Sequence, residues 1–213
     1  MSHLFIAVPT ALVLMAALAV AAPVPDEAKA PALFFPTTVG AKWTYRYPVG
    51  DVTRVVTMVE RKGGAHIVSV GQVDDGQVRP QEKLEVSAKG LYRLGAVVIT
   101  TTFDADRRAT ASWEMVAEPV PVCLLKLPAR PGDRWNLPHP QGHPAWVTAG
   151  GEEAVRVPAG SFTAVPVDFA VTSPPETPTV RARYWYARGV GLVKWTSPDG
   201  EEAVLKAFSS GRP

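Results

Sequence analysis

The sequence predicts an all-β protein, built as a curved antiparallel sheet or incomplete β-barrel of meandering hairpins, with little or no helix. Beyond residue 33, short runs rich in Val, Thr, Tyr and Trp alternate with Gly, Pro and Asp, which is typical of strands and turns. The 21 prolines leave few places for an uninterrupted helix. Hydrophobic residues make up 46% of the chain and charged residues 20%, so the chain can bury a core.

Residues 1–21 are predicted to be a signal peptide. The stretch from Leu4 to Ala22 holds no charged residue, and Ala19-Val20-Ala21 matches the small-residue cleavage rule. We therefore expect export to the periplasm or the extracellular space, with no membrane span after cleavage. An uncleaved membrane anchor is the alternative, because no Lys or Arg precedes the apolar run and its length approaches that of a bilayer span.

A Pro- and Ala-rich tether is predicted over residues 22–32, followed by one all-β domain over 33–213. The strand at 51–60 puts Val55 and Val59 on one predicted face and Arg54 and Glu60 on the other. In order, the expected strands are 42–47, 51–60, 65–73, 90–94, 96–103, 109–116, 146–150, 152–157, 161–172, 180–187, 191–197 and 201–208. Their short spacing favours neighbouring antiparallel strands over crossover units.

A repeated sequence motif divides the domain into two sequence halves, about 33–127 and 128–213. FPTTVGAKWTY at 35–45 resembles LPARPGDRWNL at 127–137: in both, a Gly precedes a cation and a Trp. This favours two related elements that each begin a strand, and a chance match is the alternative.

Metal binding has one weak candidate, the loop LPHPQGHP with His139 and His143. The surrounding prolines exclude a helix, and Glu152 or Glu153 would have to supply a third ligand. An exposed loop is the simpler interpretation, so we expect no metal and no cofactor.

The sequence gives little support to nucleic-acid binding or to enzymatic activity. The net charge is +2 with no basic block, so nucleic acid is not an expected partner. No G-x-S-x-G elbow is present, and no catalytic residue is predicted. A hydrolase would need His139 or His143 to meet an acidic residue in a pocket. The single cysteine, Cys123, cannot form an internal disulfide.

The strand VRARYWYA presents one wholly apolar or aromatic face. Alternation places Val180, Ala182, Tyr184 and Tyr186 on that face, and Arg181, Arg183 and Trp185 on the other. In the strand at 161–172, the shared face carries Val165, Val167, Phe169 and Val171. These rings either fill a core or line an apolar groove, and in the second case the candidate ligand-binding residues are Val167, Phe169, Val180, Tyr184 and Tyr186.

VPAGSFTAVPV followed by YWYARGVGLVKW, together with the opening FFPTTVGAKWTY, resembles a family of uncharacterised exported bacterial β-proteins. They share a P-x-G-x-[FY] turn and a Y-W-[FY]-[AS]-x-G-V-G hairpin. Some are similar in layout to the periplasmic lipoprotein-carrier fold, an incomplete barrel whose concave side accepts acyl chains. Two features differ here: Arg188 stands where that hairpin often has Pro, and no helix is evident to plug the concave side. The resemblance implies no catalytic residues.

We therefore expect a non-enzymatic binding module of the bacterial cell envelope that holds a hydrophobic or lipid-like ligand. Its partner would be a hydrophobic small molecule, a lipid or an envelope protein. The alternative is a structural or protein-interaction module with a filled core. An open apolar cavity of several hundred Å³ would distinguish the two.

Overall fold

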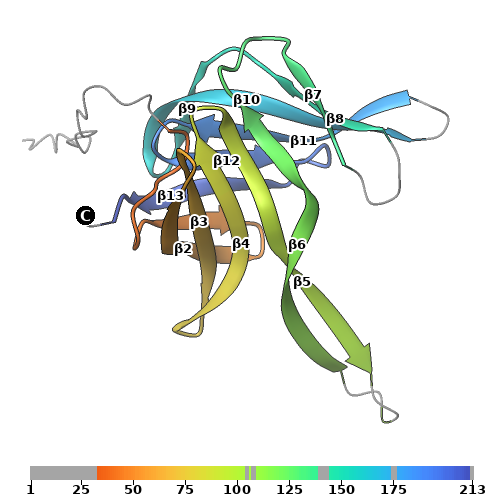
Figure 1. Ribbon diagram of the computed structural model, residues 1–213. Coiled ribbons are helices and arrows are strands. Elements are labelled where there is room, and N and C mark those ends of the chain that lie inside the picture. The colour runs from red at the N-terminus through yellow and green to blue at the C-terminus, as the bar shows by residue number, and fades with distance from the viewer. Residues whose placement is uncertain (1–32, 104–105, 107–108, 139–143, 174–176, 212–213) are drawn as a thin grey trace, which may run out of the picture.

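The chain folds into a single antiparallel sheet that nearly closes into a barrel, so the prediction of an all-β fold is confirmed (Figure 1). The computed structural model describes residues 33–103, 106, 109–138, 144–173 and 177–211. Within these ranges there is no helix, and hence none long and apolar enough to cross a bilayer. The thirteen strands are β1 (Lys42–Tyr47), β2 (Gly50–Lys62), β3 (Ala65–Asp74), β4 (Gln77–Ser87), β5 (Gly90–Phe103), β6 (Ala109–Lys126), β7 (Arg134–Leu137), β8 (Ala145–Ala149), β9 (Glu153–Val157), β10 (Gly160–Ser173), β11 (Thr177–Ala187), β12 (Gly191–Thr196) and β13 (Glu202–Ser209).

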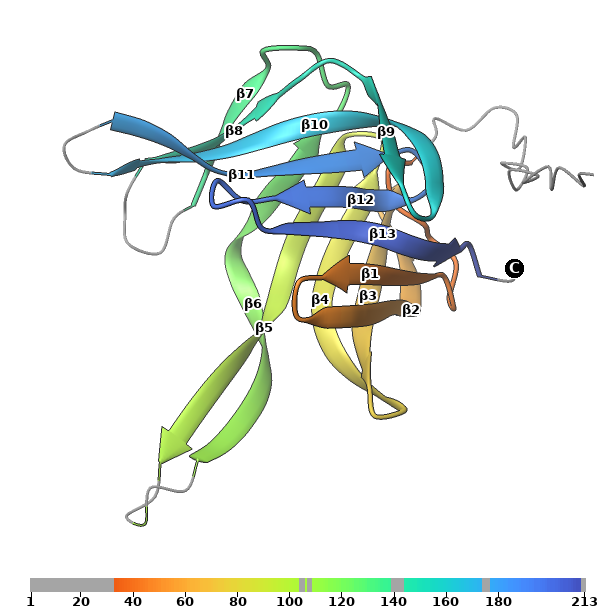
Figure 2. The ribbon, with the colours of Figure 1, turned by 180° about the vertical axis from the view of Figure 1, so that it is seen from behind.

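The strand order consists of two meanders joined at β1 and β13. It runs β6-β5-β4-β3-β2-β1-β13-β12-β11-β10-β8-β7, and β9 pairs with another part of β10. Figure 2 shows β1 and β13, the first and last strands of the chain, lying side by side. The strands β1 to β6 come from the first half of the sequence and β7 to β13 from the second.

The two ends of this path, β6 and β7, meet at a seam. The indole Nε1 of Trp135 in β7 donates a hydrogen bond to the backbone oxygen of Cys123 in β6, at 2.8 Å. The seam is thus connected by a side-chain hydrogen bond in place of a continuous ladder.

The repeated sequence element has the same backbone geometry in both halves. Gly40 and Gly132 have φ values of 83° and 88°, which favour glycine. Their backbone nitrogens donate to the oxygens of Val56 and Ala149, at 2.9 and 2.8 Å. Each turn leads directly into the first strand of its meander, β1 or β7. The two segments are therefore structurally equivalent as well as similar in sequence.

The core lies inside the barrel and includes Trp43, a residue that is only 1% exposed. Its Nε1 donates to the backbone oxygen of Val190 at 2.7 Å, so the polar end of the ring is satisfied. The Phe35 ring lies 5.0 Å from the Trp43 ring, centroid to centroid. Gly191, at φ 89°, approaches so closely that a Cβ there would lie 2.9 Å from the Phe35 ring. This turn therefore joins β11 and β12 in a hairpin and also packs against the core.

The prediction for β2 was wrong about Arg54 and Val55. Arg54 is paired with buried Trp43, and residues opposite each other in a ladder share a face, so Arg54 points into the barrel. Val55 pairs with Lys42 on the outer face. Val59 packs against the core as expected. A register shift between Val56 and Met58 inserts an extra residue, so strict alternation does not hold along the strand.

The outer parts of β5 and β6 form a ribbon that projects from the barrel (Figure 1). The pairing is irregular between Arg93 and Gly95, opposite a segment containing Pro119 and Pro121, which cannot donate ladder hydrogen bonds. Beyond it, Ile99 pairs with Trp113, and both are largely exposed. The ribbon therefore leaves the barrel at the point where the ladder is interrupted.

Candidate functional site

A cavity of about 580 Å³ occupies the interior of the barrel. Strands of both meanders contribute to its wall, so it forms only when the two halves come together. Most of the lining is apolar or aromatic, as small-molecule sites usually are. Among the apolar residues are Phe35, Trp43, Leu84, Leu91, Val122, Leu124, Leu137, Val147, Val167, Phe169 and Leu192.

Four of the five candidate ligand-binding residues lie on this wall. Val167 and Phe169 reach it from β10, and Tyr184 and Tyr186 reach it from β11. The Tyr184 and Tyr186 rings are stacked, with centroids 6.5 Å apart. The side chain of Val180 lies outside the described part of the structure. Alternation along β11 therefore brings two tyrosines to the same side of the sheet.

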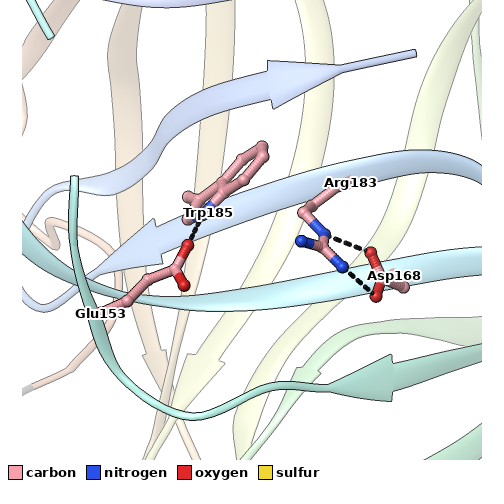
Figure 3. Close-up of polar contacts among 4 residues, drawn as sticks. All are labelled: Glu153, Asp168, Arg183 and Trp185. Atoms are coloured by element: carbon pink, nitrogen blue, oxygen red, sulfur yellow. Dashed lines mark hydrogen bonds and ion pairs between the residues drawn. The ribbon is translucent and has the colours of Figure 1, made fainter. Parts of the chain in front are cut away.

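The opposite face of β11 holds Trp185, as its position in the sequence predicts. Its Nε1 donates to Oε1 of Glu153 at 2.5 Å (Figure 3). The Arg183 guanidinium and the Lys194 ammonium lie 5.8 and 5.5 Å from the ring centroid. Arg183 also forms a bidentate pair with Asp168, at 2.5 and 2.7 Å (Figure 3). Cations and carboxylates therefore shield this ring on the outside of the barrel.

Three charged side chains interrupt the apolar wall: Arg54, Glu82 and Arg93. Nη1 of Arg54 lies 3.5 Å from Oε1 of Glu82, which is long for a hydrogen bond. Nε of Arg93 donates to Oε1 of Glu118 at 2.8 Å. Burial lowers the pKa of Arg54, but Glu82 and nearby tyrosines raise it and the net direction is upward, so the guanidinium stays charged.

Three tyrosines of the wall, Tyr45, Tyr184 and Tyr186, stay neutral at physiological pH. Burial raises the pKa of Tyr45, Tyr184 and Tyr186 above its usual value, because the interior disfavours a phenolate. The Tyr45 hydroxyl donates to the backbone oxygen of Leu192 at 2.8 Å. That bond uses the single proton of Tyr45, whereas the protonated hydroxyls of Tyr184 and Tyr186 lie on the cavity wall and can donate there.

Sequence reasoning missed the charged residues of the wall, although a signal for them exists. Glu82 stands in phase with buried Leu84 and Val86, and Arg93 stands in phase with buried Leu91. A charge in phase with the apolar face of a strand therefore indicated an inward-pointing polar group. For Arg54 the same signal was hidden by the register shift in β2.

The metal candidates His139 and His143 lie outside the described residues. Of their proposed partners, Glu152 forms an ion pair with Arg188 at 3.0 Å, and Glu153 accepts the hydrogen bond from Trp185. The described ranges contain no group of His, Cys, Asp and Glu side chains placed to hold a metal ion.

No protein-family model matches the chain, and no curated protein matches its sequence significantly. Two solved structures are similar in shape. One is a candidate lipoprotein from Parabacteroides distasonis, with a TM-score of 0.48 and 16% identity, covering 85% of this chain and 100% of that chain. The other is a candidate exported protein with a YmcC-like fold from Bacteroides fragilis, with a TM-score of 0.47 and 15% identity, covering 84% of this chain and 100% of that one. Both TM-scores lie below 0.5, so the fold described above rests on the strand pairings of this chain alone.

Proposed function

We propose that this protein is an exported, non-enzymatic binding module that holds a hydrophobic or lipid-like ligand inside its barrel. The observation that carries the proposal is the cavity of about 580 Å³ with its mainly apolar wall, a size within the usual range for small-molecule sites. The apolar run at the N-terminus, ending in Ala19-Val20-Ala21, supports export. A filled core without a ligand is the rival function, and such a volume of open apolar space favours binding over it.

The direct test is binding of an uncharged hydrophobic dye, N-phenyl-1-naphthylamine, to the purified protein. We expect saturable binding and displacement of the dye by lipid extracted from the protein's own host. Tyr186→Ala is expected to weaken dye binding by a larger factor than its effect on melting temperature alone would explain.

A second variant tests whether the cavity itself is the site. Leu124→Trp places a large ring at the cavity wall and is expected to reduce dye binding. Val116→Trp adds the same ring on the projecting ribbon, at a position that does not line the cavity, and is its matched control. Absence of saturable binding to the unaltered protein, or an equal effect of the two tryptophans, would refute the proposal.

A further inference from the structure

The charged groups of the cavity are gathered on one part of its wall. Arg54, Glu82 and Arg93 come from β2, β4 and β5, which belong to the first meander. Val167 and Phe169 come from β10 of the second meander and supply apolar surface. The interior is therefore amphipathic, with a polar region and an apolar one.

The guanidinium of Arg54, in this polar region, is incompletely hydrogen-bonded within the protein. Its Nε is buried and has no hydrogen-bond partner, and among the described residues it is the single buried side-chain nitrogen or oxygen in that condition. The contact to Glu82 is made by Nη1 at 3.5 Å and leaves Nε unsatisfied. Nε itself is closed to solvent, but Arg54 lines the cavity and 24% of its side chain is exposed, so the exposed part of the side chain is open to a ligand.

The polar region offers more donors than acceptors. The guanidinium groups of Arg54 and Arg93 are donors only, and the hydroxyls of Tyr47 and Tyr186 lie on the same wall and can donate. Burial raises the pKa of Tyr186, which keeps its hydroxyl protonated. Glu82 is the one carboxylate in the lining. Such a wall complements a ligand group that is rich in acceptors.

The contact of Arg93 with Glu118 fixes its guanidinium from one side. The bond uses Nε, and Glu118 is not part of the cavity lining. Arg93 is therefore held in place at the wall by a residue outside the cavity. A planar guanidinium that is oriented in advance loses little side-chain freedom when it binds an oxyanion.

We propose that the ligand is an acidic amphiphile, whose carboxylate or phosphate head pairs with Arg54 while its apolar chain lies against Val167 and Phe169. This inference rests on the proposed binding function and specifies the chemistry of the ligand. The head group forms a charge-assisted hydrogen bond with the part of the Arg54 side chain that faces the cavity. Glu82 lies beside the head and weakens its binding, so the arginine alone does not set the affinity.

The test compares probes that share one chain and differ in the head: decanoate, decyl phosphate, decanol and decylamine. Each competes with N-phenyl-1-naphthylamine for the unaltered protein. We expect decanoate or decyl phosphate to bind about tenfold more tightly than decanol, as one charge-assisted hydrogen bond implies, and decylamine to bind least well. The better of the two acids distinguishes a carboxylate ligand from a phosphate ligand.

Two variants assign the preference to residues. Arg54→Met is expected to abolish the preference for the acids, measured as the ratio of the affinities for decanoate and decanol in the same variant. Arg46→Met removes a charge from the outside of β1 and is expected to keep the preference. Glu82→Gln is expected to tighten binding of decanoate several-fold relative to decanol, and it tests the proposal independently if Arg54→Met fails to fold.

The outcomes separate the two proposals. If the dye binds but acid and alcohol bind equally, if decylamine binds best, or if the preference survives in Arg54→Met, the acidic head is refuted and the binding function stands. If Glu82→Gln leaves decanoate binding unchanged relative to decanol, the placement of the head beside Arg54 and Glu82 is refuted. If neither the dye nor any probe binds, the binding function itself fails.

Discussion

The indole Nε1 of Trp135 donates to the backbone oxygen of Cys123 at 2.8 Å, and this hydrogen bond joins the two ends of the sheet. Trp135 begins the second meander and Cys123 lies near the end of the first. Because β6 and β7 share no ladder, this bond connects two strands that no backbone pairing joins.

Replacement of Trp135 by Phe should therefore loosen the seam. The variant loses the hydrogen bond and part of the ring, and we expect the free energy of unfolding to fall by about 1 to 3 kcal/mol. Urea unfolding measures the loss. Trp113→Phe, in the exposed ribbon, is the control and should change stability by less than about 0.5 kcal/mol. Equal losses in the two variants would show that the hydrogen bond across the seam does not contribute specifically to the free energy of unfolding.

Gly90 and Gly50 provide a matched pair for testing close packing at a turn. Both have strongly positive φ, 144° and 134°, so Ala strains both backbones to a similar degree. A Cβ at Gly90 would overlap the backbone oxygen of Leu125, whereas a Cβ at Gly50 would meet nothing within 4 Å. We expect Gly90→Ala to destabilise by at least about 1 kcal/mol more than Gly50→Ala in urea unfolding. Equal values would mean that the β6 backbone moves freely away from this turn.

The outer face of β11 carries a part-buried hydrogen bond and an exposed ion pair, whose contributions to stability can be compared. Glu153→Ala leaves the indole of Trp185, whose residue is 9% exposed, without its acceptor, and about 1 to 2 kcal/mol of stability should be lost. Asp168→Ala removes the partner of Arg183, which is solvated, and should cost no more than about 0.5 kcal/mol. Thermal and urea denaturation compare the two. A larger effect of Asp168→Ala would reverse this ranking.

Alkaline pH should destabilise the protein through its buried tyrosines. Burial raises the pKa of Tyr186 in the folded state above the value of about 10 in the unfolded chain. Above that pH the unfolded chain releases a proton that the folded protein retains, so stability falls as pH rises. Each such tyrosine contributes up to about 1.4 kcal/mol per pH unit. Urea unfolding of the unaltered protein and of Tyr186→Phe, between about pH 9 and 11, should show a shallower decline in the variant; parallel declines would contradict the argument.

The class of fold and the faces of β11 could be predicted because they depend on local information. Turn residues and β-branched runs mark the hairpins, and the alternation in VRARYWYA places Tyr184 and Tyr186 opposite Trp185. The inward position of Arg54 could not be predicted, since one extra residue between Val56 and Met58 changes the phase of the strand.

The sequence left open whether the apolar faces fill a core or line a cavity, although four of the candidate residues do lie on the cavity wall. Its wall combines residues such as Arg54 and Tyr186, which are more than a hundred positions apart and meet only through the pairing of β1 with β13. No local pattern encodes that pairing. The repeated Gly-to-Trp segments were the one sequence feature that pointed to two similar halves, and the matching hydrogen bonds of Gly40 and Gly132 give them a structural basis.

The neighbourhood of β1 and β13 has a consequence for how the chain acquires its structure. Lys42 pairs with Ser209, and the backbone nitrogen of Gly189 donates to the oxygen of Leu33 at 2.7 Å. The N-terminal segment of the described fold therefore depends on C-terminal segments as its hydrogen-bond partners. Until the C-terminal strands are available, β1 exposes an unpaired edge and Trp43 lacks its acceptor at Val190. Contacts between residues so distant in sequence form slowly. Closure of the barrel is therefore a late step of folding that needs the whole chain. A chain truncated before β13 would expose the unpaired edge of β1 and part of the hydrophobic core, and it would be prone to aggregation and proteolysis.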